Sequence, residues 1–387
     1  MRVGLDARYA FRRQRRGIGE YVAALLQHLP AVAAADDAFV LYVDGLADPG
    51  ALPLPDGRFR LRQLPAANPL LWEEVALPRA AGRDGLDLLH LTSNYGPSAP
   101  PCPTVYTIHD LIEFLRPQFG RVRLPLRHAA GRAVRIRTLP GQARRASAVI
   151  TVSEASRRDL VRLLGLPAGQ IHVIPHGITV AAAPATDAAA ARAALRDRGF
   201  AVPETYVLAM GALDARKNGP FLMRGFSDVA AEFPEAQLWI VGVERLSAYA
   251  LPWIQPPAWL QIRGFAPRED LVRLISGATA FAYPSLYEGF GFPALEAMAC
   301  GVPVLASNRS SLPEVVGDAG LLFDPTDRTA LAASLRRILA EPDLRRDLVA
   351  RGRQRLARFS WEAAARATYG VYREVAAMPR RAEAAAR

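Results

Sequence analysis

Short apolar runs alternate with helical patterns along nearly the whole sequence, and this alternation restricts the fold more than any other feature. Six runs lie in the first half of the chain, at residues 3–7, 39–43, 88–92, 104–109, 149–153 and 171–175. Six more lie in the second half, at residues 206–211, 237–242, 260–265, 280–285, 303–307 and 320–324. Strands that alternate with helices are typical of parallel sheets built from βαβ units. The pattern therefore predicts an α/β protein with two doubly wound, Rossmann-like sheets, and 387 residues are enough for two domains.

The break between the two sets of runs lies near residues 177–200. An alanine-rich stretch is followed by a helical pattern at residues 188–198, and no strand signal occurs between Pro175 and Tyr206. We predict an N-terminal domain of residues 1–178 and a C-terminal domain of residues 179–360. Residues 361–387 should form a last helix, over 361–377, and a frayed tail.

Several features of the sequence narrow the class of protein. Cys102 and Cys300 are the only cysteines, and their unlike contexts fit buried thiols in a reducing compartment. The first residues lack the apolar core of a signal peptide, and no run of about 18 apolar residues is present. We therefore expect a cytoplasmic protein without a transmembrane helix.

Motifs of several enzyme classes are missing. The sequence has no D-x-D motif and no Cys/His cluster with metal-ligand spacing, so no metal or other cofactor is expected. It also lacks G-x-S-x-G, a Walker lysine loop and G-x-G-x-x-G. These absences disfavour a hydrolase, a P-loop NTPase and a dehydrogenase.

The basic residues are unevenly distributed. Residues 116–145 contain nine arginines and no acidic residue. This segment is either a solvated helical face or a surface for an anionic membrane, which would place the protein peripherally at the inner face of the membrane. We expect no nucleic-acid partner. Lys217 is the only lysine, although the other 47 basic residues are arginine, which indicates that this position needs an ammonium group.

The most informative segment reads YEGFGFPALEAMACG and follows the apolar run at residues 280–285. Gly289 and Gly291 allow a close approach of the backbone to a ligand. A helix should run from about residue 292 to residue 299, with free N–H groups at its start that favour an anion. Within this segment Glu288 and Glu296 could contact a ligand. Alternatively, Glu288 caps the helix and Glu296 is a surface residue.

Other candidate residues follow strands. Arg216 and Lys217 come after the run at residues 206–211, where cations could stabilise phosphate groups. His109 ends another run, at the strand ends where ligands of α/β sheets bind, although a structural histidine is the alternative. Ser153 is interpreted as an N-cap and His176 as part of a turn.

These motifs together resemble a known family. The E-x7-E spacing of Glu288 and Glu296 is the signature of retaining glycosyltransferases with the GT-B fold, in glycosyltransferase family 4 (group 1). The matching segments are GALDARKN at 211–218, residues 284–325, GIGEY at 17–21, TIHD at 107–110, VSEASRRDL at 152–160 and IPHG at 174–177. The resemblance implies two Rossmann-like domains that face each other across a cleft, with the last helix crossing back onto the first domain.

The resemblance also implies roles for the candidate residues. Glu296 would hold the donor ribose, and Glu288 would place the donor sugar and stabilise charge. The remaining implied donor-site residues are Arg216, Lys217, Gly289, Phe290, Gly291, Gly17 and Gly19, and His109 would contact the donor sugar or the acceptor. Many family members carry an arginine in a G-R pattern where this chain has Gly211 and Ala212, so Arg216 is the candidate to replace it.

The implied reaction is metal-independent transfer of a sugar, with retention of configuration, from a nucleotide-sugar donor to a saccharide or lipid-linked acceptor. The RKN and YEGFGFP sequences most resemble mannosyl- and rhamnosyltransferases of bacterial polysaccharide assembly, which favours GDP-mannose as donor. Three alternatives stay open. They are a phosphorylase with pyridoxal phosphate on Lys217, a nucleotide-sugar epimerase, and a catalytically silent nucleotide-sugar sensor.

Overall fold

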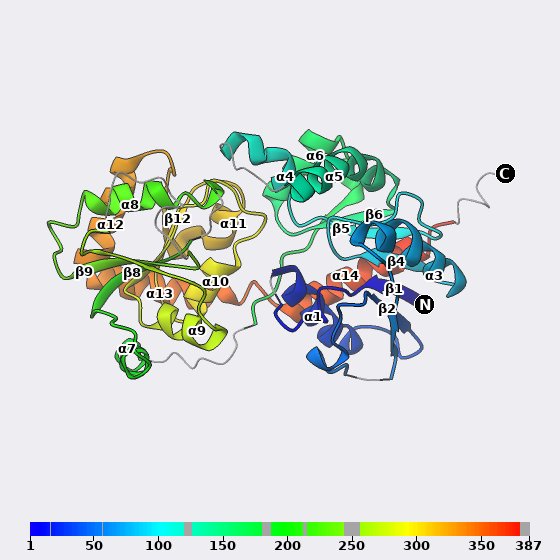
Figure 1. Ribbon diagram of the computed structural model, residues 1–387, viewed down its shortest axis with the longest axis horizontal. Helices are drawn as coiled ribbons and strands as arrows, with labels where there is room; N and C mark the ends of the chain where they lie inside the picture. The colour runs from blue at the N-terminus through cyan, green and yellow to red at the C-terminus, as the bar shows by residue number, and fades with distance from the viewer. Residues whose placement is uncertain are drawn as a thin grey trace. The chain divides into compact units, whose positions relative to one another are not determined.

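The computed structural model describes residues 1–15, 17–55, 57–119, 126–179, 187–211, 215–243 and 256–379, and it divides into two compact units (Figure 1). Of the described residues, the first unit contains 1–114, 126–177 and 360–379, and the second contains 115–119, 178–179 and the rest up to 359. Each unit is a parallel sheet with helices on both faces, as the alternation of apolar runs predicts.

The first unit has a seven-stranded parallel sheet in the order β3-β2-β1-β4-β5-β6-β7. Its strands are β1 (Arg2–Asp6), β2 (Ala38–Val43), β3 (Phe59–Gln63), β4 (Leu88–Leu91), β5 (Thr104–Thr107), β6 (Ala148–Thr151) and β7 (Ile171–Val173). Its longer helices are α1 (Gly17–His28), α3 (Leu77–Arg83), α5 (Leu126–Arg145), α6 (Glu154–Leu164) and α14 (Trp361–Ala376). Shorter helical elements are η1 (Leu29–Ala31), η2 (Pro49–Ala51), α2 (Pro69–Leu71), a π-helix η3 (Trp72–Ala76), α4 (Ile112–Leu115) and η5 (Ala168–Gln170).

One strand of this sheet, β3, is not among the apolar runs predicted from the sequence. This strand lies at the edge of the sheet and pairs only with β2. Its sequence, FRLRQ, alternates apolar residues with arginine and glutamine, and only its first residue is buried. One face of this edge strand is exposed to solvent and carries polar side chains. The strand therefore lacks the continuous apolar run from which the other strands were predicted.

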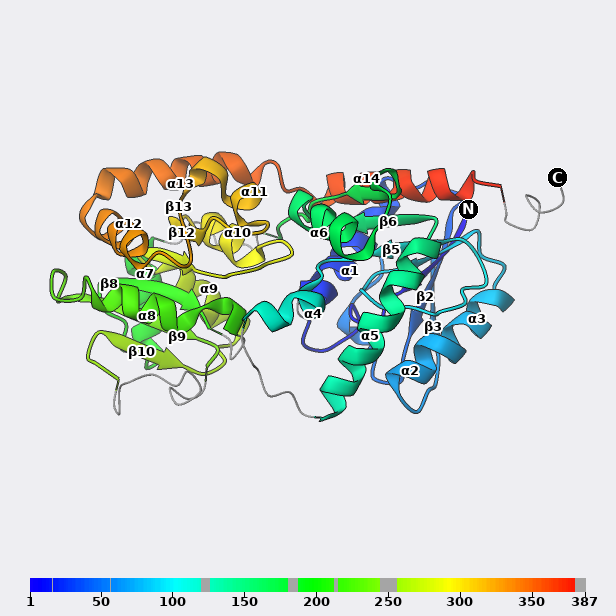
Figure 2. The same ribbon diagram turned by 90° about the horizontal axis from the view of Figure 1, so that it is seen from above.

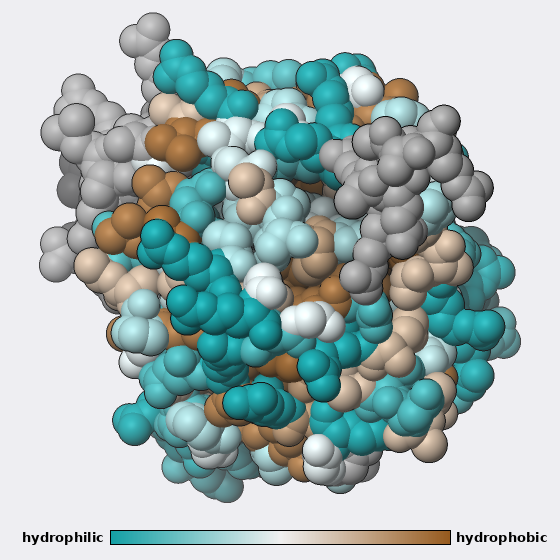
Figure 3. Space-filling model, turned by 90° about the vertical axis from the view of Figure 1, so that its right-hand side faces the viewer, coloured by the Kyte–Doolittle hydropathy of each residue, from teal (hydrophilic) through white to brown (hydrophobic). Residues whose placement is uncertain are grey.

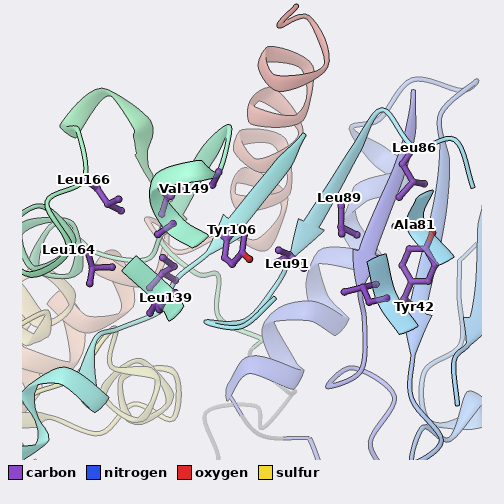
Figure 4. Packing of buried hydrophobic residues seen from close by; sticks show 14 of the residues in the cluster. Tyr42, Ala81, Leu86, Leu89, Leu91, Tyr106, Leu139, Val149, Leu164 and Leu166 are labelled. Atoms are coloured by element: carbon purple, nitrogen blue, oxygen red, sulfur yellow. The ribbon is translucent and has the colours of Figure 1, made fainter. Parts of the chain in front are cut away.

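The core of the first unit lies between the sheet and its helices. In Figure 4, Tyr106 and Leu91 of the central strands lie between Leu139 of α5 and Leu164 of α6 on one side and Leu89 of β4 on the other. Trp72 and the apolar side of α3 complete this cluster. On the opposite face of the sheet, α1 and α14 pack together, as Figure 2 shows.

The face visible in Figure 3 is a mosaic of hydrophilic and hydrophobic residues without a broad apolar area.

The last helix, α14, is part of the first unit although 182 residues of the second unit precede it. Ser360 caps its first turn by accepting a hydrogen bond from the N–H of Ala363. The Tyr372 hydroxyl lies 2.6 Å from His90 Nδ1 of β4, and the Tyr369 hydroxyl donates to Asp37. These contacts bind the end of the chain to the first sheet.

The second unit has a six-stranded parallel sheet in the order β10-β9-β8-β11-β12-β13. Its strands are β8 (Thr205–Met210), β9 (Ala236–Val241), β10 (Leu260–Arg263), β11 (Ala280–Tyr283), β12 (Val304–Ser307) and β13 (Gly320–Phe323). Its α-helices are α7 (Ala188–Asp197), α8 (Gly219–Ser227), α9 (Arg268–Ser276), α10 (Phe292–Ala299), α11 (Leu312–Val316), α12 (Arg328–Ala340) and α13 (Pro342–Leu356). The 3-10 turns are η4 (Arg116–Phe119), η6 (Ala215–Lys217) and η8 (Gly317–Ala319).

Both sheets reverse their strand order once. The reversal lies between β1 and β4 in the first unit and between β8 and β11 in the second. The connections after the two strands at such a switch point run in opposite directions, which opens a crevice beyond their carboxyl ends where ligands bind. The residues that follow β1, β4, β8 and β11 are therefore the first candidates for a functional site.

Candidate functional site

In the second unit, the two segments predicted to contact the donor meet at the switch point. Arg216 and Lys217 lie in η6, after β8, and Glu288 follows β11. Arg216 Nη1 lies 2.5 Å from Glu288 Oε2, and Lys217 Nζ lies 2.8 Å from Glu288 Oε1. The side chain of Glu288 is 11% exposed and those of both cations are 15% exposed. One carboxylate is thus shared by two cations, and the cluster carries a net positive charge.

The electrostatics of this cluster favour its charged state. Burial raises the pKa of the Glu288 carboxyl, but the charges of Lys217 and Arg216 outweigh burial and hold that pKa below its ordinary value. The ammonium group of Lys217 also lies 4.9 Å from the centre of the Tyr283 ring and 3.4 Å from its hydroxyl. Burial raises the pKa of Tyr283 well above its ordinary value, so that its hydroxyl stays neutral.

The loop after Glu288 is braced by the start of α11. The Glu288 N–H donates to Ser310 Oγ at 2.8 Å. The Ser311 hydroxyl lies 2.9 Å from the carbonyl of Glu288 and 2.5 Å from that of Phe290. Gly291 has a φ of +131°, and a Cβ there would lie 3.1 Å from Leu312. Glycine is therefore required at this position by the backbone conformation as well as by the close packing.

Helix α10 begins at Phe292 and ends at Ala299, as the sequence predicts. Glu296 lies inside it, and its Oε1 is 2.5 Å from Nη1 of Arg268 in the first turn of α9. Arg268 was not among the predicted site residues, because no local sequence pattern relates it to Glu296, which lies 28 positions away. Glu296 is 17% exposed and Arg268 is 56% exposed, so the arginine can move away from the carboxylate.

A segment from the first half of the chain also reaches this site. Phe119, at the end of η4, has its ring centre 6.0 Å from that of Tyr287, the residue before Glu288. The expected domain boundary kept this segment in the N-terminal domain. The structure groups residues 115–119 with the second unit, because they pack against Tyr287 and η6. Phe119 belongs to no motif, so this contact cannot be predicted from the sequence.

The other predicted site residues lie in the first unit. His109 is 7% exposed, its Nε2 lies 3.0 Å from the carbonyl of Thr92, and its Nδ1 lies 3.2 Å from Nε2 of His176. Burial lowers the pKa of His109 to about 4, so the ring is neutral at pH 7. A hydrogen bond from this ring to a substrate would have to replace one of these two contacts. His176, interpreted from sequence as part of a turn, is a direct partner of His109.

The glycines of GIGEY start helix α1. Gly17 is its first residue, and space is open where its side chain would be. A Cβ on Gly19 would lie 2.6 Å from the carbonyl oxygen of Tyr9, so Gly19 lets the helix pack against the loop after β1. Ser153 caps α6, as expected, by accepting a hydrogen bond from the N–H of Ser156.

The described residues also bear on metal binding and on membrane insertion. Within the described residues, no group of three or more His, Cys, Asp or Glu side chains is arranged to hold a metal ion. In that same part of the chain, no helix is both long and apolar enough to cross a membrane.

Comparison with protein families and solved structures identifies the family and the fold of the chain. Residues 15–182 match the family described as Glycosyltransferase Family 4, and residues 192–355 match Glycosyl transferases group 1. Sucrose-phosphate synthase from Thermosynechococcus elongatus superposes with a TM-score of 0.71 at 25% identity, over 97% of this chain and 98% of that structure. The chain therefore belongs to the group 1, family 4 type of glycosyltransferases, and its fold is GT-B.

Two bacterial glycosyltransferases are among the similar proteins. O-antigen chain mannosyltransferase B of Escherichia coli is 35% identical over 237 residues, which are 59% of this chain and 61% of the relative. D-inositol 3-phosphate glycosyltransferase of Acidothermus cellulolyticus is 31% identical over 72% of this chain and 64% of the relative. The chain thus spans less than two thirds of these relatives' length. The Anabaena protein HepE in complex with UDP and glucose has a TM-score of 0.67 at 18% identity, over 97% of this chain and 99% of that structure.

Proposed function

We propose that the protein is a retaining glycosyltransferase that takes its sugar from a nucleotide diphosphate donor bound by the second unit. The observation that carries this proposal is the cluster of Arg216, Lys217 and Glu288 at the switch point of the second sheet. Two cations and one carboxylate leave a positive charge where a diphosphate can bind. The carboxylate lies between the cations, in a position to stabilise positive charge on the sugar.

The reaction breaks the bond between the anomeric carbon and the donor phosphate oxygen, and it forms a bond to an acceptor hydroxyl on the same face of the sugar. The leaving diphosphate takes up negative charge and accepts the proton of the acceptor hydroxyl. Lys217 and Arg216 would stabilise that charge, and fixed cations of this kind can replace a metal ion. No enzyme carboxylate has to attack the sugar, so Glu288 acts through its charge.

Further contacts to the donor are proposed for residues of both units. The backbone of Gly289, Phe290 and Gly291 would face the sugar and the diphosphate, and Glu296 would hold the ribose hydroxyls once Arg268 moves aside. Gly17 and Gly19 would present amides of the α1 N-terminus to the diphosphate. His109 is proposed to contact the donor sugar or the acceptor.

The donor that we propose is GDP-mannose, and the acceptor is a saccharide or lipid-linked saccharide of polysaccharide assembly in the cytoplasm. Support comes from the E. coli mannosyltransferase, which is 35% identical over 59% of this chain. The experiment is a panel of GDP-, UDP-, ADP- and dTDP-sugars with saccharide acceptors in excess EDTA, with products identified by mass and anomeric NMR. We expect an α-linked mannoside. An inverted linkage, or activity restored only by manganese, would contradict the mechanism.

The same panel separates the alternatives. An epimerase would convert the donor without an acceptor, and a silent sensor would bind donors without turnover. A phosphorylase would show the visible absorbance of pyridoxal phosphate on Lys217.

Glu296→Gln is expected to weaken donor binding by about 10- to 100-fold, since a hydrogen bond to a charged group is worth about 1.5–3 kcal/mol. The measurement is calorimetric titration with the nucleoside diphosphate. Glu269→Gln is the matched control, because Glu269 pairs with Arg273 on the exposed side of α9. Equal affinities of the two variants for the nucleoside diphosphate would show that Glu296 does not bind the donor.

We also propose weak binding of the arginine-rich segment, residues 116–145, to anionic lipid. The structure limits this effect, because Arg132 contacts Glu113, Arg135 lies over Tyr95, and Arg144 donates to the Leu164 carbonyl. The structure does not describe the side chains of four other arginines of this segment, Arg116, Arg121, Arg123 and Arg127. Flotation with anionic vesicles that weakens with salt is expected; equal flotation with neutral vesicles would contradict it.

A further inference from the structure

Two residues beside the cluster of Arg216, Lys217 and Glu288 have an unfavourable backbone conformation. Among the described residues, Asn218 and Ser310 are the two non-glycine residues in the left-handed region, with φ of +55° and +52°. Residues with a Cβ atom rarely adopt this conformation, and those that do concentrate at functional sites. Asn218 directly follows Lys217 in the chain, and Ser310 contacts Glu288. Both partners of the ion pair between Lys217 and Glu288 therefore have such a residue next to them.

Asn218 precedes helix α8, but it does not cap that helix. Asparagine is a common N-cap, where its side chain accepts a hydrogen bond from the first turn. The Asn218 side chain makes no such hydrogen bond. Its Nδ2 donates instead to the carbonyl of Pro325, which lies 107 positions away in the loop after β13, at 2.9 Å. The side chain thus fixes the end of η6, where Lys217 lies, to the loop after another strand.

The two serines before α11 also contact another segment. Ser311 is the N-cap of α11, yet its side chain makes no cap hydrogen bond. Its hydroxyl lies 2.9 Å from the carbonyl of Glu288 and 2.5 Å from that of Phe290. The Ser310 hydroxyl accepts a hydrogen bond from the N–H of Glu288 at 2.8 Å. The backbone that carries the Glu288 carboxylate is thus held at both its N–H and its carbonyl.

Ordinary caps occur elsewhere in the protein. Ser153, Ser360 and Asp327 each accept a hydrogen bond from an N–H in the first turn of the helix that they precede. In the loops after β8 and β12, residues of the same kind contact the segments of Lys217 and Glu288 instead. The helices there lose a cap, and the two charged groups are fixed in place.

We infer that Asn218, Ser310 and Ser311 are positioning residues, which hold Lys217 and Glu288 in the geometry needed for transfer at a cost in the stability of the fold. The inference rests on the proposed function of this cluster, and it adds the residues that determine the geometry. Asn218 acts through Lys217, and the two serines act through the backbone of Glu288. A displacement of about 1 Å can lower a catalytic rate by about 100-fold, so small shifts of these loops are sufficient for a large effect.

The first test measures transfer by the full chain in variants of these residues. Glycine adopts the left-handed conformation without strain, so Ser310→Gly and Asn218→Gly should fold and melt close to the wild-type temperature. Ser310→Gly removes the acceptor for the Glu288 N–H, and kcat should fall by about 10- to 100-fold with unchanged affinity for the nucleoside diphosphate. Ser311→Ala should act in the same way. Asn218→Gly should lower kcat/KM for the donor by a similar factor.

Asp327→Ala is the matched control, because Asp327 is an exposed, ordinary cap of α12 in the same unit. It should lower the melting temperature and leave the kinetics unchanged, which is the opposite pattern. Wild-type kinetics in both glycine variants would overturn the inference. A loss of rate that occurs only together with a loss of thermal stability would overturn it as well.

A second test does not depend on activity. Lys217 is the only lysine of the sequence, so isotope-labelled lysine gives one NMR signal, which reports the surroundings of this side chain. The signal should shift in Ser310→Gly and Asn218→Gly, which alter the contact of 2.8 Å with Glu288, and stay unchanged in Asp327→Ala. If the wild-type protein transfers no sugar, the proposed function fails and this signal decides the inference. A shifted signal then supports the positioning role, and an unshifted signal refutes it.

Discussion

Lys217→Arg is expected to lower kcat/KM for the donor by about 10²–10³, the loss seen when one preorganised charge-stabilising group is removed from an active site. Lys217 Nζ contacts Glu288 at 2.8 Å and lies beside the Tyr283 hydroxyl at 3.4 Å, and the side chain is 15% exposed. A guanidinium is larger and planar, so it cannot place its charge where the compact ammonium lies. The fold itself tolerates arginine, which occupies every other basic position of the chain.

The measurement is steady-state transfer at varied donor concentration, with thermal unfolding as the control for folding. Lys217→Ala should be at least as damaging, and the acceptor KM should stay constant in both variants. The reciprocal replacement Arg273→Lys, at a surface ion pair of α9, should leave the kinetics unchanged. Wild-type kinetics in Lys217→Arg would mean that the single lysine has no special role.

Glu288→Gln is expected to lower kcat by about 10²–10³ without weakening the binding of the nucleoside diphosphate. The variant removes the negative charge that lies 2.5 Å from Arg216 and 2.8 Å from Lys217. Both cations are then available to the diphosphate, so its affinity should stay constant or rise. The sugar loses the carboxylate that stabilises its positive charge, and turnover falls.

Calorimetric titration with the nucleoside diphosphate and single-turnover transfer measure the two effects separately. Loss of a buried ion-pair partner also destabilises a protein, by about 3–5 kcal/mol when an uncompensated charge remains. Glu288→Gln should therefore melt at a lower temperature, and the assays belong well below that melting point. Weaker diphosphate binding with unchanged turnover would assign Glu288 to ground-state binding only.

The sequence predicts the class of fold well, because buried strands and amphipathic helices leave local periodic patterns. All strands with a continuous apolar run were found, helix α10 has the predicted bounds, and the prediction of two doubly wound sheets is confirmed. The edge strand β3 was missed because half of its side chains face water. The two glutamates of the E-x7-E signature were recognised for a similar reason, since their spacing is local to one loop and one helix.

Contacts between distant segments required the tertiary structure. Lys217 and Glu288 are 71 positions apart, and they meet because β8 and β11 are neighbours in the sheet. The pairs Arg268 with Glu296, Phe119 with Tyr287, and Arg8 with Glu73 depend in the same way on which elements lie side by side. The periodicity of apolar residues reflects which side chains are buried, and it determined the strands and the helices. The sequence by itself also determined which types of residue are available for chemistry. The order of the strands and the packing of the loops are properties of the whole chain, and they alone decided which charges share a site.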